Sequence, residues 1–167
     1  MVVRAIIEIP QGSQNKYEMD VKTGAVRLDR VLYGSMHYPA NYGFVPDTWG
    51  TDNDPLDIVV YGSTAIHPGV DVPVRVVGAL MMQDEHGLDA KLIGVIDVDP
   101  RMDGISILED LGTHRLKELR HFFQEYKTLQ GLSVTLGNYQ DVVMAERLWR
   151  ESVDRWHARQ EGERPDA

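Results

Sequence analysis

Short apolar runs recur along the first two thirds of the chain. The segment Val2 to Ile9 is apolar and β-branched and ends at Pro10, which is typical of a β-strand. Similar runs predict further strands over residues 17–21, 25–32, 56–61, 72–82 and 90–98. Thr23-Gly24 suits a hairpin turn between the first two of these runs, and Glu85-His86-Gly87 is expected to connect the last two.

The spacing of apolar residues becomes helical in the last third. Four of them recur three and four positions apart, namely Leu116, Leu119, Phe123 and Tyr126. A second helix is predicted from about Tyr139 to Trp156 with Asn138 as its N-cap, and a short strand from Leu132 to Leu136 precedes it. The polar residues 160–167 are expected to form a frayed tail. Strands followed by helices predict an α+β fold, and this pattern leaves open whether the strands form a closed or a partly open barrel.

The composition is that of a globular protein. The chain has 167 residues, of which 43% are hydrophobic and 26% charged, so we expect a single domain over residues 1–167. No apolar run approaches the length of a membrane span, and the N-terminus lacks a secretory signal pattern. The absence of cysteine excludes disulfides, thiolate zinc sites and a cysteine nucleophile. We therefore expect a cytoplasmic protein with no membrane partner.

The formal net charge is −9. This charge speaks against nucleic acid as a partner, because non-specific binding depends on cations that neutralise phosphates. A phosphate ligand is still compatible with an acidic chain, since bound metal ions reverse the local potential.

An acidic turn carries the first candidate chemistry. Asp52, Asp54 and Asp57 fall within six residues, and Asp57 opens an apolar strand. Pro55 fixes its own φ and pushes Asp54 toward extended conformations. Hard cations such as Mg²⁺ take oxygen ligands, and clustered carboxylates repel one another unless a cation lies among them. The turn therefore indicates a divalent-metal site.

Two other structures are conceivable for this turn, a capped surface turn and an EF-hand. Asp and Asn are common in turns because their side chains cap backbone groups, and from composition alone this interpretation has equal standing. An EF-hand fails, because the fifth, sixth and twelfth places counted from Asp52 hold Leu56, Asp57 and Ser63. The chain also lacks the P-loop, Gly-x-Gly, Gly-x-Ser-x-Gly and His-Glu-x-x-His motifs.

A second acidic cluster contains Asp84, Glu85, Asp89 and Lys91. Asp89 and Lys91 are two residues apart on a predicted strand, so their side chains should face the same side. An acid beside a lysine suits a metal and the phosphate bridged to it. The alternative is a solvated hairpin tip with a surface ion pair.

Taken in order, these segments resemble the bacterial type of the soluble (family I) inorganic pyrophosphatases. The resemblance is collinear from Ile6 to about Leu129. Its motifs are Ile7-Glu8-Ile9-Pro10, Asn15-Lys16-Tyr17-Glu18, Leu28-Asp29-Arg30, Tyr38-Pro39-Ala40-Asn41-Tyr42-Gly43, the Asp52–Asp57 turn, Asp84 through Lys91, His121-Phe122-Phe123 and Tyr126-Lys127.

The resemblance implies a fold and an activity. The fold is a five-stranded OB-like β-barrel flanked by two main α-helices. The activity is hydrolysis of inorganic pyrophosphate to two orthophosphates with several Mg²⁺ ions per subunit, for which Mn²⁺ or Zn²⁺ are possible substitutes. A homo-oligomer, by family analogy a hexamer, is also implied.

The resemblance also implies roles for individual residues. The expected metal ligands are Asp52, Asp57, Asp84, Asp89 and Glu18. The expected phosphate-binding residues are Lys16, Arg30, Tyr42, Lys91, Tyr126 and Lys127. Asp54 matches the residue that positions and deprotonates the attacking water, and Lys16, Arg30 and Tyr42 join it in the catalytic set. Glu8 and Tyr38 are expected to line the same cavity in supporting roles.

The chain departs from the family pattern at three places. Asn53 stands where many relatives have glycine, and Asn tolerates the left-handed backbone that such a turn needs. Leu132 stands about where relatives often carry a lysine, and the segment before Ile6 is shorter than usual. Two other functions stay open at this point, a hydrolase of another phosphoanhydride such as a nucleotide, and an OB-type binding module without catalysis.

Overall fold

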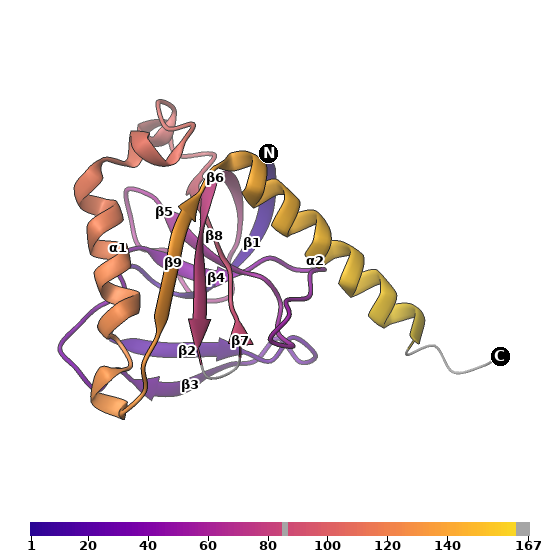
Figure 1. Cartoon of the computed structure of the whole chain (residues 1–167), viewed down its shortest axis with the longest axis horizontal. Helices are drawn as coiled ribbons and strands as arrows, with labels where there is room; N and C mark the ends of the chain where they lie inside the picture. The colour runs from indigo at the N-terminus through magenta and orange to yellow at the C-terminus, as the bar shows by residue number, and fades with distance from the viewer. Residues whose placement is uncertain (85–86, 163–167) are drawn as a thin grey trace.

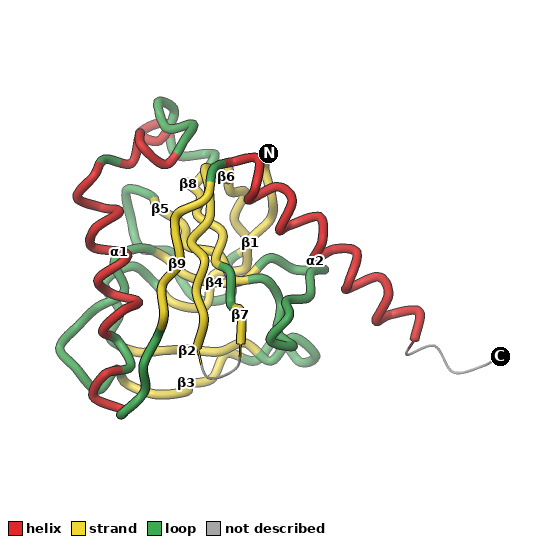
Figure 2. The backbone as a smooth tube through the Cα atoms, viewed as in Figure 1, coloured by secondary structure: helices red, strands yellow, loops and turns green. Residues whose placement is uncertain are grey.

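Five strands close into a mixed β-barrel in the computed structural model, which describes residues 1–84 and 87–162 (Figures 1 and 2). In spatial order they are β1 (Val2–Ile9), β4 (Asn41–Phe44), β5 (Asp57–Tyr61), β8 (Lys91–Ile96) and β6 (Asp71–Asp84). The barrel closes where β6 pairs with β1, from Val2 opposite Arg75 to Ile6 opposite Asp71. Neighbouring strands are antiparallel except β5 and β8, which are parallel. The expected five-stranded barrel with two main helices is confirmed.

The strands β5 and β8 are apolar along most of their length because both of their faces are buried. Ile58 and Val60 belong to one hydrophobic cluster, whereas Val59 and Tyr61 belong to another. Alternate side chains of a strand point to opposite faces, so a strand buried on both faces needs apolar residues at consecutive positions. This is why the run at residues 58–61 was readable as a strand.

The short strand β4 was not predicted. All four of its residues are buried, but it is brief and contains a glycine, which weakens a strand signal. Gly43 is needed here because a Cβ atom would lie 1.9 Å from the Ile6 carbonyl oxygen. The close approach of β1 to β4 therefore depends on this glycine.

A separate hairpin, β2 (Asn15–Met19) and β3 (Val26–Val31), crosses one end of the barrel at the bottom of Figure 1. The predicted turn at Thr23-Gly24 is present. The Asp20 carbonyl accepts hydrogen bonds from both backbone N–H groups, and Gly24 has a φ of 71°.

The two helices α1 (Thr113–Glu125) and α2 (Val142–Gly162) lie on opposite sides of the barrel (Figure 1). Leu119, Phe122 and Phe123 of α1 pack into one hydrophobic cluster, and Ala145 of α2 packs into the other. Among the described residues, no helix is both long and apolar enough to cross a membrane. The remaining elements are short: η1 (Pro100–Met102), η2 (Leu108–Leu111), η3 (Thr128–Gln130), β7 (Gly87–Leu88) and β9 (Thr135–Gln140).

The region before α2 differs from the prediction. The strand expected over residues 132–136 overlaps β9 only at residues 135 and 136, and β9 extends to Gln140 because it pairs with β6, Gln140 lying opposite Ala79. Asn138 is therefore a strand residue and not the N-cap. Asp141 caps α2, its Oδ1 accepting from the Met144 N–H at 2.9 Å. The helix continues through Gly162, so residues 160–162 are helical and not a frayed tail, and residues 163–167 lie outside the described part.

Candidate active site

A cavity of about 400 Å³ lies where the hairpin meets the barrel, a volume in the usual range of small-ligand sites. Most of the predicted site residues line it: Glu8, Lys16, Glu18, Arg30, Tyr42, Asp52, Asp54, Asp57, Asp89, Lys91, Tyr126 and Lys127. They come from six strands, the acidic turn, the segment before β8 and the segment after α1. Residues spread over more than a hundred positions of the chain are thus brought to one cavity.

Lys91 lies at the centre of this constellation. Its side chain is 2% exposed, and its Nζ donates to Asp57 Oδ2 at 2.7 Å and to Asp89 Oδ2 at 2.8 Å. Burial lowers the pKa of Lys91, but the Asp57 and Asp89 carboxylates outweigh it and hold the pKa above its ordinary value. The ammonium group therefore stays charged. Asp89 and Lys91 face the same side, as their spacing predicts.

Tyr42 completes a small network with these charges. Its hydroxyl accepts from Lys91 Nζ at 2.8 Å and donates to Asp57 Oδ2 at 2.5 Å. Burial and then the charge of Asp57 raise the pKa of Tyr42 well above its usual value. The phenol therefore keeps the proton that it donates to Asp57.

The acidic turn is held by its own backbone. Asn53 has a φ of 69°, which confirms that this position needs the left-handed conformation. The Gly50 N–H donates to the Asp54 carbonyl at 2.6 Å, and the Asp54 N–H donates to Asp52 Oδ1 at 3.3 Å. A Cβ on Gly50 would lie 2.4 Å from Asp52 Oδ1, so the turn closes this tightly because residue 50 is glycine.

Three carboxyl groups of the cavity hold protons more strongly than usual. Burial, followed by the charges of Asp52 and Asp57, raises the pKa of Asp54. Burial raises the pKa of Asp89 to about 6, although Lys91 opposes the shift. Burial raises the pKa of Glu8 to about 7, even though Glu8 Oε1 accepts from the Met19 N–H at 2.7 Å. Burial is the first cause of each shift, and the cavity is lined by six carboxyl groups against four lysine and arginine side chains.

The hairpin supplies cations to the same cavity. Lys16 Nζ donates to Glu18 and to Asp29 Oδ2, the latter at 3.1 Å. Lys16 and Glu18 thus share a strand face, as expected. Burial lowers the pKa of Lys16, but the bonds to Glu18 and Asp29 outweigh it and raise the pKa above its ordinary value.

Arg30 forms an ion pair and keeps a donor open. Its Nε lies 3.0 Å from Asp29 Oδ2, so the interpretation of Arg30 as the partner of Asp29 holds in part. The geometry is not that of a hydrogen bond, and this buried Nε has no hydrogen-bond partner among the described residues. A buried donor of this kind is costly unless a ligand accepts from it.

An aromatic cluster supports the wall of the cavity. Tyr38 is buried behind it, with its ring centroid 5.6 Å from Tyr42 and 4.7 Å from Phe122. Tyr38 does not line the cavity, so its role there is support by packing. Burial raises the pKa of Tyr126, and Lys127 Nζ lies 5.7 Å from the Tyr126 ring centroid.

Sequence reasoning missed residues that belong to this site. Trp49 and Phe44 line the cavity, and Asp29 holds both Lys16 and Arg30. The backbone of Asp84 ends β6, but its side chain lies outside the described part of the structure, as do Glu85 and His86. Leu132 does not line the cavity.

Comparisons with known proteins agree on one family. A family model described as inorganic pyrophosphatase matches residues 5–157. The chain is 47% identical over 156 residues to the inorganic pyrophosphatase of Geobacillus stearothermophilus, covering 93% of this chain and 94% of that relative. The chain belongs to the inorganic pyrophosphatase family.

Solved structures of inorganic pyrophosphatases have the same fold. The Thermus thermophilus structure matches with a TM-score of 0.90 at 45% identity, covering 93% of this chain and 91% of that one. The Helicobacter pylori structure matches with a TM-score of 0.91 at 38% identity, covering 93% and 94%. The predicted bacterial pyrophosphatase type, and with it an enzyme that hydrolyses pyrophosphate, is confirmed.

Pyrophosphatases of this family generally use a divalent metal cofactor, and the donors of the cavity fit such an ion. Asp52, Asp57 and Asp89 offer carboxylate oxygens, the ligands that hard cations prefer, and the charges of Asp52 and Asp57 add to burial in raising the pKa of Asp54. Over residues 1–84 and 87–162, no three acidic or histidine side chains are close enough to hold an ion as they stand. Lys91 Nζ bonds to Oδ2 of Asp57 and to both carboxylate oxygens of Asp89.

Proposed function

We propose that this chain hydrolyses inorganic pyrophosphate to two orthophosphates in a Mg²⁺-dependent reaction. The observation that carries the proposal is the single cavity in which Asp52, Asp54, Asp57 and Asp89 meet Lys16, Arg30 and Lys91. Carboxylates suit the metal ions, and the cationic side chains suit the phosphoryl oxygens. Pyrophosphate is small and highly charged, so it needs both kinds of group in one place.

In this proposal the metal is held by Asp52, Asp57, Asp84, Asp89 and Glu18. When bound, Mg²⁺ neutralises phosphate charge and makes water more acidic. The carboxylates of the acidic turn and β5 favour these roles over surface capping because Asp52, Asp54 and Asp57 all line the cavity.

The cationic and phenolic side chains are proposed to bind the two phosphoryl groups. They are Lys16, Arg30, Tyr42, Lys91, Tyr126 and Lys127. Arg30 suits a phosphoryl oxygen because its buried Nε is left without a hydrogen-bond partner among the described residues. Asp57 holds both Tyr42 and Lys91, so the two side chains already lie in the cavity before charge grows on the leaving phosphate.

Asp54 is proposed as the proton acceptor. The water oxygen attacks one phosphorus atom, the bond from that phosphorus to the bridging oxygen breaks, and the bridging oxygen leaves with the electron pair on the second phosphate. Asp54 takes the proton that the water loses. Its raised pKa makes it a better base than an ordinary aspartate.

The test is steady-state release of phosphate from pyrophosphate, with ATP as the competing substrate. We expect rapid turnover of pyrophosphate with Mg²⁺, loss of turnover in EDTA, and slow turnover of ATP. Preferred hydrolysis of ATP would favour the other phosphoanhydride activity. Salt-dependent oligonucleotide binding without hydrolysis would favour a binding module.

We also propose that the enzyme is a cytoplasmic homo-oligomer, a hexamer by analogy with its family. Exposed apolar side chains gather on and beside the hairpin, at Val21, Leu28, Val31 and Tyr33, and such groups often mark subunit contacts. Analytical ultracentrifugation of the full chain gives the subunit number directly, and a monomer at micromolar concentration would contradict this proposal.

A further inference from the structure

Helix α2 holds one residue of the loop that leads into the acidic turn. The backbone N–H of Trp49 donates to the Ser152 carbonyl at 2.9 Å, and the Trp49 carbonyl accepts from Arg155 Nε at 2.8 Å. The Arg159 guanidinium lies 3.8 Å from the centroid of the Trp49 ring. Both backbone polar groups and the side chain of Trp49 are thus fixed by residues from one face of the helix.

Trp49 is coupled to the proposed metal ligands by a short and tight stretch of chain. It stands three residues before Asp52 and lines the large cavity. The next residue, Gly50, donates to the Asp54 carbonyl and leaves no room for a Cβ beside Asp52 Oδ1. A displacement of Trp49 should therefore also displace Asp52, because the chain between them is short and tightly packed.

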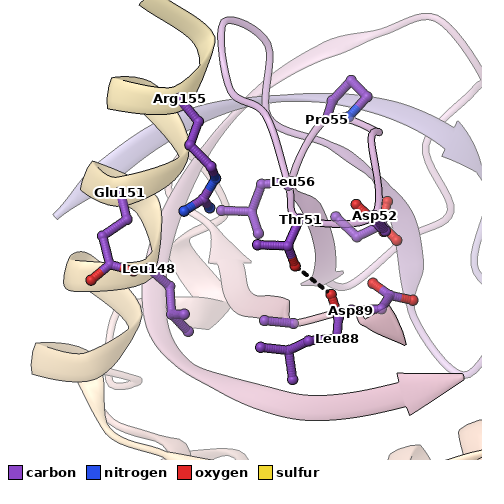
Figure 3. Close-up of a pocket in the computed structure, with 12 residues that line it drawn as sticks. Thr51, Asp52, Pro55, Leu56, Leu88, Asp89, Leu148, Glu151 and Arg155 are labelled. Atoms are coloured by element: carbon purple, nitrogen blue, oxygen red, sulfur yellow. Dashed lines mark hydrogen bonds between the residues drawn. The ribbon is translucent and has the colours of Figure 1, made fainter. Parts of the chain in front are cut away.

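A second link ties the turn to the strand end that carries Asp89. Thr51 Oγ1 donates to the Leu88 carbonyl at 2.8 Å (Figure 3). The carboxylates of Asp52 and Asp89 point away from α2 in this view, and both line the large cavity on the other side. The Thr51 bond therefore fixes the separation of the two segments that supply these carboxylates.

The rear of the turn is not filled by packing. A small cavity of about 70 Å³ lies between the turn and α2, and Leu148 and Arg155 reach toward it from the helix (Figure 3). Side chains next to empty space lack contacts that would resist a displacement. The position of the turn thus depends on the few polar bonds that cross this gap, of which the Arg155 bond to Trp49 is one.

We infer that Arg155 is a positioning residue that sets the affinity of the acidic turn for its metal ion. It acts through Trp49 and touches neither the metal ligands' carboxylates nor the substrate site. The inference rests on the proposed function, in which Asp52 binds a divalent cation. Groups that orient metal ligands typically change metal affinity by about 10- to 100-fold when removed, and we expect the lower part of this range because Arg155 acts through a neighbour.

The experiment measures metal binding directly. Isothermal titration calorimetry of Mg²⁺ into the metal-free full-length enzyme is compared for wild type, Arg155→Ala and Arg150→Ala. Arg150 is the matched control because it lies on the same helix and pairs with Glu146 at an exposed position. We expect Kd for Mg²⁺ to rise about 10-fold in Arg155→Ala and to stay at the wild-type value in Arg150→Ala.

Kinetics supply a second readout. The Mg²⁺ concentration for half-maximal pyrophosphate turnover should rise by the same factor as Kd, while kcat at saturating Mg²⁺ stays close to wild type. If Arg155→Ala does not fold by circular dichroism, Arg155→Met keeps the long stem and removes the donor, and the same comparison applies.

Two outcomes would overturn the inference, and they are distinguishable. Unchanged Mg²⁺ affinity in the Arg155 variant, with a lower melting temperature, would mean that the Arg155 bond only stabilises the fold. A wild-type enzyme that binds no Mg²⁺ would remove the proposed function itself, and this inference with it.

Discussion

Asp54 and Asp57 are three positions apart but meet different surroundings. Asp57 Oδ2 accepts from Tyr42 and Lys91, so it is fixed in place and surrounded by donors. No side chain among the described residues donates a hydrogen bond to the Asp54 carboxyl group, and its pKa is raised by burial and by Asp52 and Asp57. A fixed carboxylate suits a metal ligand, and one that binds a proton more readily suits a base.

The first prediction compares substitutions at these two positions. Asp57→Asn should lower both the affinity for Mg²⁺ and the rate of turnover by about 100-fold or more, because it removes a charged ligand while changing little volume. Asp54→Asn should instead keep the Mg²⁺ affinity of the wild type and lower kcat by about 100- to 1,000-fold, the usual contribution of a general base. Calorimetry with Mg²⁺ and steady-state kinetics measure the two quantities separately.

Each variant is the control for the other, and circular dichroism checks that both fold. Near-normal turnover of Asp57→Asn would contradict its role as a shared ligand. Loss of metal binding in Asp54→Asn would contradict the assignment of Asp54 as the base.

Glu8 predicts how the stability of the metal-free enzyme depends on pH. Its pKa is raised from an ordinary 4.5 to about 7, so between these values the folded chain holds a proton that the unfolded chain releases. Protonated Glu8 therefore makes its whole contribution to the free energy of unfolding below pH 4.5. This contribution is lost as the pH rises to about 7, and its size is on the order of 2–3 kcal/mol. Glu8→Gln should remove this part of the pH dependence.

Urea unfolding at pH 5, 6, 7 and 8 in EDTA measures this difference. Asp89 titrates in the same direction in both proteins, so the wild-type curve minus the Glu8→Gln curve isolates Glu8. Parallel curves for the two proteins would show that the Glu8 pKa is not raised in the folded state.

The order of the motifs made most site residues predictable. It did not predict Trp49 and its contact with Arg155, nor the contacts of Asp29. Trp49 is fixed by Arg155, which lies 106 positions further along the chain, and no local pattern reports such a contact. Asp29 was visible beside Arg30, but its bond to Lys16 depends on how the hairpin strands pair. The roles of the lining residues as ligands and donors stay predictions from the resemblance.

The contact between Lys16 and Asp29 was not predictable because it depends on an irregularity in the β2–β3 hairpin. Lys16 lies opposite Arg30 and Tyr17 opposite Leu28, so Asp29 is an extra residue on β3 and forms a β-bulge. In a regular strand Asp29 and Arg30 would point to opposite faces. The bulge lets the Asp29 carboxylate contact both Lys16 and Arg30, and bulges recur beside active sites, where they re-aim a side chain.

Strands with both faces buried were predictable from their apolar runs. The first and last residues of the strands were not. The apolar run of β5 was sufficient, whereas β4 is too short and β9 takes its length from pairing with β6. Because this pairing extends β9 to Gln140, Asp141 caps α2 in place of the predicted Asn138. Local propensity is overridden here by hydrogen bonds to a strand far away in the sequence.

Gly43 provides the prediction at this scale. A Cβ at this position meets the Ile6 backbone at 1.9 Å, and backbone cannot move aside as a side-chain tip can. Gly43→Ala should therefore lower the free energy of unfolding by about 3 kcal/mol or more. Chemical denaturation measures the change.

Gly104→Ala is the matched control, because a Cβ there meets nothing within 4 Å. It should leave the free energy of unfolding close to that of the wild type. Equal stabilities of the two variants would mean that β1 and β4 separate without cost.

The whole molecule carries a net charge of −9, and part of that charge is concentrated in the cavity. A cation that binds the folded chain there, and not the unfolded chain, stabilises the fold by mass action. At a Mg²⁺ concentration about 100 times Kd, the gain should be about 2.7 kcal/mol. The melting temperature should rise accordingly with Mg²⁺ and fall again when EDTA is added.

Sodium chloride at the same ionic strength is the control for general screening of charge. Asp57→Asn should show the sodium chloride response but not the additional rise with Mg²⁺. An equal rise in wild type and Asp57→Asn would place the stabilising ion outside the proposed site.

The closure of the barrel by β1 and β6 has a consequence for synthesis on the ribosome. β1 pairs with β4 on one edge and with residues 71–75 on the other, so β1 keeps an unpaired edge until residue 75 has been synthesised. Contacts of such high sequence separation slow folding, because a long loop must close before they form. The nascent chain therefore carries an apolar strand with an open edge for much of its elongation, and this is the stage at which it most needs protection from aggregation.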